Sequence, residues 1–146
     1  MVQGRCVFRL WGLMCALLCL PALAQPLLDD DNRRAIRSVI QAQLDAFQAD
    51  DAETAFSFAT PGIQARFRDP ETFMGMVRSG YQPVYRPGSV LFQELVPFAD
   101  SVAQQVLITD ESGRSVLAVY PMEQQNDGSW RIAGCYLRPA PNRQLL

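Results

Sequence analysis

The sequence predicts an α+β domain in which N-terminal helices are followed by an antiparallel sheet of about four strands. Between residues 30 and 80, apolar residues recur at the three- and four-residue steps of amphipathic helices. From residue 89 onward, runs rich in β-branched residues are separated by short clusters of turn residues. Apolar residues make up 49% of the 146 residues, which is enough to bury one core without metals or disulfides.

The first helix is expected to follow the acidic run at residues 29–31 and to end near residue 50. Acidic side chains suit the positive N-terminal end of a helix, and a solvated, frayed terminus is the alternative interpretation of the run. One face of this helix is apolar at helical spacing, so we expect that face to lie against the core. It consists of Ile36, Val39, Ile40, Leu44 and Phe47.

Three shorter helices are expected before residue 80, and each has a start signal. Acidic and hydroxyl side chains cap helix N-termini, proline is favoured at the first helical position, and glycine favours a stop. The start signals are Asp50 or Asp51 with Glu53, Thr60 with Pro61, and Asp69 with Pro70, and the stop is Gly80.

Four strands are expected in the second half, mostly joined as sequential antiparallel hairpins. They occupy residues 89–98, 101–110, 115–125 and 129–139, with turn residues between them. The segment 81–88 contains Pro83 and Pro87, so it is at best a short edge strand or an ordered arm.

Residues 1–24 have the pattern of a signal peptide. Arg5 and Arg9 form the positive region, residues 10–20 are an apolar run, and residues 22–24 are a small-x-small cleavage signal. The run is shorter than the ~20 residues that a membrane-spanning helix needs, which favours cleavage after Ala24 over a permanent anchor. We therefore expect an exported protein, periplasmic or secreted, without a stable membrane span after cleavage. Its single domain would occupy residues 25–146 with a core at about 33–141, and an uncleaved N-terminal membrane anchor is the alternative.

The composition excludes several chemistries. The chain has no histidine, and all thirteen basic residues are arginines, so Ser-His and Cys-His pairs, histidine metal sites and lysine Schiff bases are ruled out. We expect no cofactor and no metal. Removing Arg5 and Arg9 leaves eleven arginines against fifteen Asp and Glu residues, and this balance does not favour nucleic acid.

The order of elements and several segments resemble known families. AFQADDAETAFSFATPGI before the strands and DGSWRIAGCYL at their end resemble the nuclear-transport-factor-two-like (SnoaL-like) superfamily. More narrowly, FATPGIQARF, MVRSGYQPVYRP and WRIAGCYL are similar to the bacterial family catalogued as domain of unknown function 4864, a similarity that spans about residues 36–141. The superfamily resemblance implies a cone, in which a bent sheet wraps a long helix and leaves an internal pocket, and it leaves open a homodimer through the outer face of the sheet. No catalytic residue is carried over, because the narrower family has no assigned activity.

Cys135 is the single cysteine expected after cleavage, so no internal disulfide can form. Strict alternation along residues 129–139 places Trp130, Ile132 and Tyr136 on one face and Cys135 on the other. A free cysteine in such a row usually behaves as a small buried hydrophobe. We interpret Cys135 as core packing, and a reactive thiol is the alternative.

Four residues are candidates for binding a ligand. Alternation places Glu94 on one strand face with Phe92, Val96 and Phe98, where an acid would have a raised pKa, whereas an edge position or an arginine partner is the ordinary alternative. Tyr120 shares a row with Val116 and Ala118, and Tyr81 and Tyr85 either rim a pocket mouth or pack half-buried. Arginines gathered at that mouth would favour an anionic ligand, although solvated helix faces are their default location. These arginines are Arg66, Arg68, Arg78 and Arg86.

The function predicted from these residues is a non-catalytic module that binds a small molecule or a protein partner. The alternative is a small proton-transfer or lyase-type enzyme that uses Glu94 and a tyrosine inside the pocket. An enzyme needs a base within hydrogen-bond reach of a substrate proton, so the position of Glu94 separates the two hypotheses.

Overall fold

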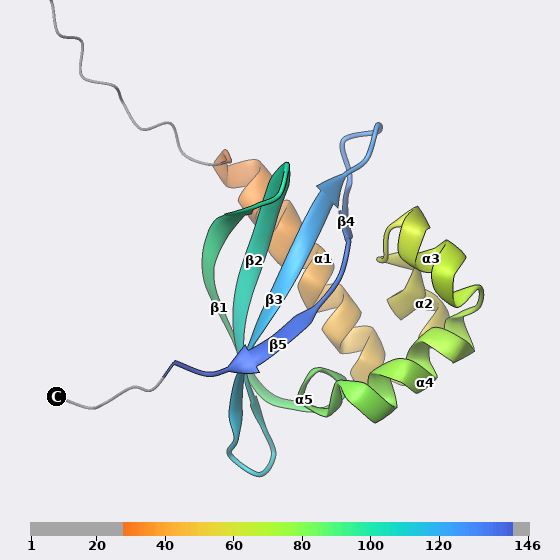
Figure 1. Ribbon diagram of the computed structural model, residues 1–146, viewed down its shortest axis with the longest axis vertical. Helices are drawn as coiled ribbons and strands as arrows, with labels where there is room; N and C mark the ends of the chain where they lie inside the picture. Colours follow the sequence, from red (N-terminus) through yellow and green to blue (C-terminus); the bar gives the residue numbers. More distant parts are fainter. Residues whose placement is uncertain (1–27, 142–146) are drawn as a thin grey trace, which may run out of the picture.

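The computed structural model describes residues 28–141 and shows helices followed by an antiparallel sheet (Figure 1). The helices are α1 (Asp30–Gln48), α2 (Ala52–Ser57), α3 (Pro61–Phe67), α4 (Pro70–Gly80) and α5 (Gln82–Tyr85). The strands are β1 (Pro87–Phe98), β2 (Ser101–Asp110), β3 (Ser115–Gln124), β4 (Trp130–Ile132) and β5 (Tyr136–Pro139). The α+β prediction is confirmed. The expected signal peptide at residues 1–24 lies outside this part of the chain, and no helix within residues 28–141 is long and apolar enough to cross a membrane.

Side chains cap the first four helices at residues that the sequence marked as start signals. Each cap accepts a bond from the backbone N–H three residues further on, which satisfies a donor that the helix itself cannot pair. The cap pairs are Asp29 with Asn32 (2.8 Å), Asp51 with Thr54 (3.0 Å), Thr60 with Ile63 (3.5 Å), and Asp69 with Thr72 (2.8 Å). Of the two alternatives for α2, Asp51 is the cap, whereas Asp50 adopts a left-handed φ of 54° between α1 and α2.

The segment expected as an arm or edge strand holds the short helix α5 instead. Pro83 lies in the first turn of α5, where its missing N–H costs no helical bond. The strand β1 then begins at Pro87.

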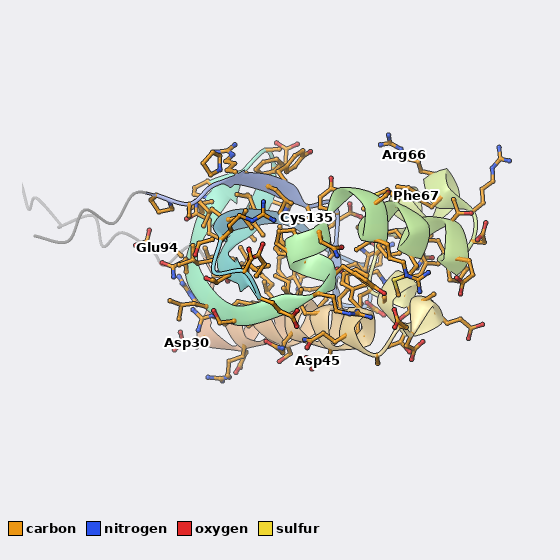
Figure 2. The ribbon with its side chains drawn as sticks, turned by 90° about the horizontal axis from the view of Figure 1, so that it is seen from below. Asp30, Asp45, Arg66, Phe67, Glu94 and Cys135 are labelled. Atoms are coloured by element: carbon orange, nitrogen blue, oxygen red, sulfur yellow. The ribbon has the colours of Figure 1, made fainter. Side chains whose placement is uncertain are left out.

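The core lies between α1 and the concave face of the sheet. Ile36, Ile40 and Leu44 of α1 are fully buried, as the helical spacing predicted. They pack against a face of β2 and β3 on which Val102 is paired with Met122, Val106 with Ala118, and Ile108 with Val116. Viewed from below, the sheet curls around its interior and α1 runs along one side of it (Figure 2).

The last strand differs from the prediction, because the expected strand at 129–139 is divided into β4 and β5. Both pieces pair with β3, and residues 133–135 leave the sheet between them. Pro121 of β3 lies opposite this gap; it accepts a bond from the N–H of Ala133 (2.8 Å) but has no N–H to return. Pairing resumes where Val119 meets Tyr136. As a result, Tyr136 is 54% exposed instead of buried with Trp130 and Ile132.

A β-bulge in β1 sets the curvature of the first edge of the sheet. Phe92 pairs with Val106 and Leu95 with Gln104, so β1 contains one extra residue between these pairs. Phe92 and Leu95 both pack against the core. The buried Gln104 side chain donates to the carbonyl oxygens of Gln93 (2.9 Å) and Glu94 (3.3 Å), whose pairing the bulge disrupts.

Replacing Gln104 with Met should destabilise the domain, because it keeps the length of the side chain but removes the donor to these carbonyls. The expected loss in the free energy of unfolding is about 1–3 kcal/mol, measured by urea denaturation. Gln105→Met is the control, because Gln105 is the neighbouring, less buried glutamine. Equal and small effects of the two substitutions would show that Gln104 does not support the bulge.

Candidate functional site

A cavity of about 500 Å³ opens between the helices and the break in the last strand. Its helical walls come from Phe47 of α1, Ile63 and Phe67 of α3, and Phe73 and Val77 of α4. The opposite wall consists of Tyr120 of β3, Ile132 of β4, and residues 133–136. The volume lies within the range of small-molecule sites, which are typically about 300–1,000 Å³.

Tyr120 lies in the sheet wall of the cavity, and only 1% of it is exposed. Its hydroxyl is buried and has no hydrogen-bond partner among the described residues. Burial raises the pKa of Tyr120 well above its ordinary value, and the neighbouring Cys135 thiol adds to this effect. The hydroxyl is therefore neutral, and the weakly hydrogen-bonding Cys135 thiol, instead of an oxygen or nitrogen atom, is the polar group that acts on it among the described residues.

Cys135 packs against the core and also lines the cavity. Burial raises the pKa of its thiol from 9.0 to about 12, which the nearby Tyr120 hydroxyl only partly offsets. A thiol with this pKa is a poor nucleophile near neutral pH. The interpretation of Cys135 as an apolar packing residue agrees with this environment, although the residue is half-buried and not fully enclosed.

Gln43 brings a third polar group to the cavity, from α1. The side chain is buried, and its amide donates to the carbonyl oxygen of Ala55 at 3.0 Å. This bond joins α1 to α2 and fixes the glutamine on the cavity wall. Sequence reasoning missed Gln43, although it lies seven residues after Ile36 and three after Ile40 and therefore falls on the apolar stripe of α1.

The remaining polar groups cluster around Tyr81, just after α4. Tyr81 lines the cavity, as do Arg66 and Tyr136. Partial burial is the main cause that raises the pKa of Tyr81; the nearby Cys135 and Tyr136 raise it further, and Arg66 lowers it. Cys135, Tyr136 and Arg66 thus lie close enough to Tyr81 to shift the pKa of its hydroxyl.

Two of the four candidate ligand-binding residues line the cavity and two do not. Tyr81 and Tyr120 lie in its walls, whereas Tyr85 and Glu94 lie outside it. The prediction that Glu94 shares a face with Phe92 is wrong, because the bulge breaks the alternation between them. Glu94 is exposed on the outer side of the curled sheet, far from Cys135 and the α3 end (Figure 2).

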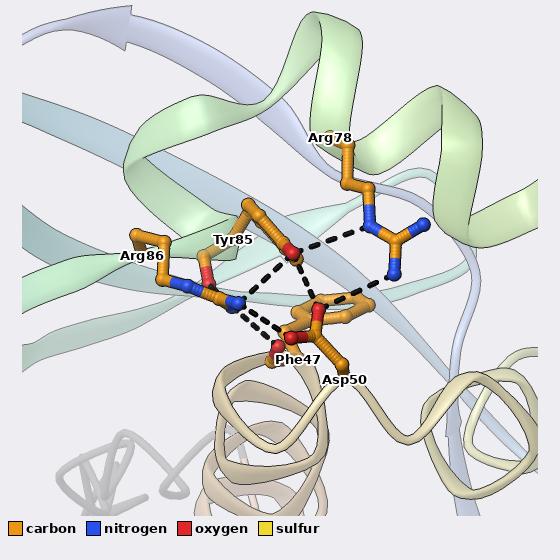
Figure 3. A network of polar contacts seen from close by, with 5 residues as sticks. All are labelled: Phe47, Asp50, Arg78, Tyr85 and Arg86. Atoms are coloured by element: carbon orange, nitrogen blue, oxygen red, sulfur yellow. Dashed lines mark hydrogen bonds and ion pairs between the residues drawn. The ribbon is translucent and has the colours of Figure 1, made fainter.

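Tyr85 belongs to a separate surface cluster that joins the end of α1 to α4 and α5 (Figure 3). The Asp50 carboxylate accepts bonds from the Tyr85 hydroxyl, from Arg78 (3.3 Å) and from Arg86 (2.8 Å). Arg86 also donates to the carbonyl oxygen of Phe47 at 2.6 Å. The hydrogen bond from Tyr85 is the main cause that lowers the pKa of the Asp50 carboxyl; desolvation opposes it, and Arg78 and Arg86 lower the pKa further.

The four arginines expected at a pocket mouth are therefore divided between different places. Arg78 and Arg86 are occupied by Asp50, and Arg68 is an exposed residue that ends α3 with a φ of 71°. Only Arg66 reaches the cavity. Within residues 28–141, no group of three His, Cys, Asp or Glu side chains is placed to hold a metal ion.

The curled sheet, its enclosed helix and the lined cavity together define an α+β pocket domain. A family model described as "Domain of unknown function (DUF4864)" matches residues 29–145, and the chain belongs to this family. A search of curated proteins gives no match.

Replacing Tyr120 with Phe should stabilise the ligand-free protein, because it removes a buried hydroxyl that has no partner. We expect the free energy of unfolding to rise by about 1 kcal/mol in urea denaturation. Tyr136→Phe is the control, because that exposed hydroxyl is solvated and its loss should be nearly neutral. Destabilisation by Tyr120→Phe alone would mean that the hydroxyl makes a bond in the ligand-free protein.

Cys135 should react slowly with iodoacetamide in the folded protein. A pKa of about 12 in place of 9.0 makes the thiolate about a thousandfold scarcer near neutral pH. Mass spectrometry of the peptide that contains Cys135 should show labelling at least about a hundredfold slower in buffer than in concentrated urea. Equal rates in the two solvents would contradict this placement of the thiol.

Proposed function

We propose that the domain is a non-catalytic module that binds a small molecule in this cavity. The observation that carries the proposal is the Tyr120 hydroxyl, which is buried at the cavity wall and has no partner among the described residues. A ligand acceptor at this wall would supply the missing bond. Binding would then add a hydrogen bond that the protein does not make by itself.

The position of Glu94 argues against the alternative of a proton-transfer or lyase-type enzyme. General acid–base catalysis requires a base within hydrogen-bond reach of the substrate, and Glu94 lies outside the cavity. Among residues 28–141, no Asp or Glu side chain lines the cavity. The Tyr120 hydroxyl and the Cys135 thiol have raised pKa values, so neither is a ready base near neutral pH.

We further propose that the domain belongs to the nuclear-transport-factor-two-like superfamily. The support is architectural: a curled sheet with one long helix packed along one side, and a cavity between that helix, the shorter helices and the sheet. This support concerns the fold and carries no activity with it.

A homodimer through the outer face of the sheet is part of the same proposal. Leu91 (51% exposed) and Tyr136 (54% exposed) are the exposed large hydrophobic residues of the described chain. Leu91 pairs with Leu107, and Leu107 with Leu117, so a row of leucines crosses β1, β2 and β3. Such a row can pair with its own copy across a two-fold axis, which is the common geometry of homodimers.

We also propose that the protein is exported and that residues 1–24 are removed. The support is the sequence pattern alone: a positive region with Arg5 and Arg9, an apolar run, and small residues before Gln25. The competing proposal is an uncleaved anchor.

Native mass spectrometry of the protein isolated from its own cells tests ligand binding, dimerisation and cleavage after Ala24 in one experiment. The expected result is a chain that begins at Gln25, travels as a dimer, and carries a small molecule that unfolding releases. A chain that begins before Gln25 would contradict cleavage. Release of no small molecule would contradict the ligand proposal.

Two variants separate the outcomes of this experiment. Met76→Trp places a large ring on the half-buried α4 wall of the cavity and should remove the small molecule but leave the dimer intact. Leu91→Glu should give monomers that keep the small molecule, because it places a charge in the leucine row. Gln48→Glu adds the same charge on exposed α1 and should change neither property.

A further inference from the structure

The interior of the cavity is built to hold an apolar ring or chain. Phe47, Phe67 and Phe73 all line it, and they contact one another through the Phe73 ring, whose centre lies 6.1 Å from that of Phe47 and 5.5 Å from that of Phe67. The Phe67 and Phe73 rings meet edge to face. Aromatic clusters of this kind accept another ring readily, because stacked and edge-on contacts are both favourable.

The charge at the cavity comes from a single residue. Arg66 is the one charged side chain that lines the cavity among residues 28–141, and no residue of that range forms a salt bridge with it. Arg66 is exposed, and its side chain projects from the end of α3 at the rim of the cavity (Figure 2); its guanidinium carbon lies 5.9 Å from the centre of the Phe67 ring. An unpaired guanidinium next to an apolar cavity attracts a carboxylate or sulfonate.

Other donors also line the cavity. The Tyr81 hydroxyl lies close enough to Arg66 for the guanidinium to influence it. The backbone N–H groups of Gly134 and Cys135 lie in the gap between β4 and β5, and neither donates to a backbone carbonyl within the described residues. The lining thus includes hydrogen-bond donors besides Arg66, on both the helical side and the sheet side of the cavity.

We propose that the ligand is an amphipathic monoanion, whose apolar body contacts the phenylalanines and whose carboxylate or sulfonate pairs with Arg66. This inference rests on the proposed ligand-binding function and names the class of ligand. A dianion is disfavoured because Arg66 is the single charged residue of the lining: Arg78 and Arg86 are held by Asp50, and Arg68 lies outside the cavity. A cationic ligand is disfavoured because Arg66 would repel it and no carboxylate lines the cavity to pair with it.

Two fluorescent probes with the same rings test the inference. Anilinonaphthalenesulfonate carries one sulfonate, and N-phenylnaphthylamine is the same ring system without it. The wild-type protein should bind both probes. Arg66→Gln should weaken binding of the sulfonate about three- to fivefold, which is the size expected for an exposed ion pair, and should leave the neutral probe unchanged.

Matched variants show where and why the probes bind. Arg68→Gln removes the same charge from the next exposed arginine outside the cavity and should affect neither probe. Arg66→Lys should restore most of the sulfonate affinity, and high salt should weaken that affinity in the wild type only to the Arg66→Gln level. Met76→Trp should reduce binding of both probes. Thermal melting checks that each variant is folded.

The possible results distinguish failure of the inference from failure of the proposed function. If the neutral probe binds in the cavity but Arg66→Gln and Arg68→Gln have the same effect on the sulfonate, the anionic ligand is wrong and the pocket stands. If neither probe binds, or if Met76→Trp leaves the binding of both unchanged, the ligand-binding pocket itself is wrong.

Discussion

The contact between the apolar stripe of α1 and the concave face of the sheet is the interaction on which the rest of the structure depends. Ile36, Ile40 and Leu44 have no exposed surface. Full burial of such a side chain stabilises a fold by about 1.5–3 kcal/mol, so these three residues alone contribute a large part of a typical net stability. The concave face of the curled sheet receives this stripe (Figure 2). The bulge in β1 and the break in the last strand are two places where the pairing of this sheet departs from regularity.

The cavity lies beside the break in the last strand. Both pieces of that strand pair with β3, but β4 is also fixed to the helices: the Trp130 indole donates to the Asn32 side chain (2.7 Å), and the backbone of Ile132 pairs with that of residues 58–60. Residues 133–135, between the two pieces, leave the sheet and line the cavity together with residues of α3 and α4. The cavity thus forms where the sheet departs from regular pairing.

The local parts of this fold were predictable from the sequence and the non-local parts were not. Each helix cap depends on a side chain and a backbone N–H three residues away, so Asp29, Thr60 and Asp69 identify their helices directly. The bulge involves Gln104, which lies ten and eleven residues from the bulge carbonyls that it satisfies, and strict alternation consequently placed Glu94 on the same face as Phe92. Pro121 is present in the sequence, but the sequence does not show which residues of the last strand lie opposite it. Its effect on the pairing of that strand could therefore not be predicted. Tyr81 and Tyr120, two of the candidate ligand-binding residues, line the cavity, whereas no local pattern showed that Asp50 would hold Tyr85.

The residues that line the cavity distinguish it from a packing defect. One wall is made of aromatic side chains, and the facing wall includes Ala59, Ala133, Gly134 and Cys135, which are small. At Gly134 the backbone does not require glycine, because an added Cβ would meet only ordinary contacts, at 3.9 Å with Tyr136 and 4.0 Å with Pro121. Larger side chains on this wall would bury more apolar surface, and cavity filling is a common route to stability. The wall stays small at Gly134, where an added methyl group would fit, and the buried Tyr120 hydroxyl belongs to the same lining; a site shaped for a ligand has such features.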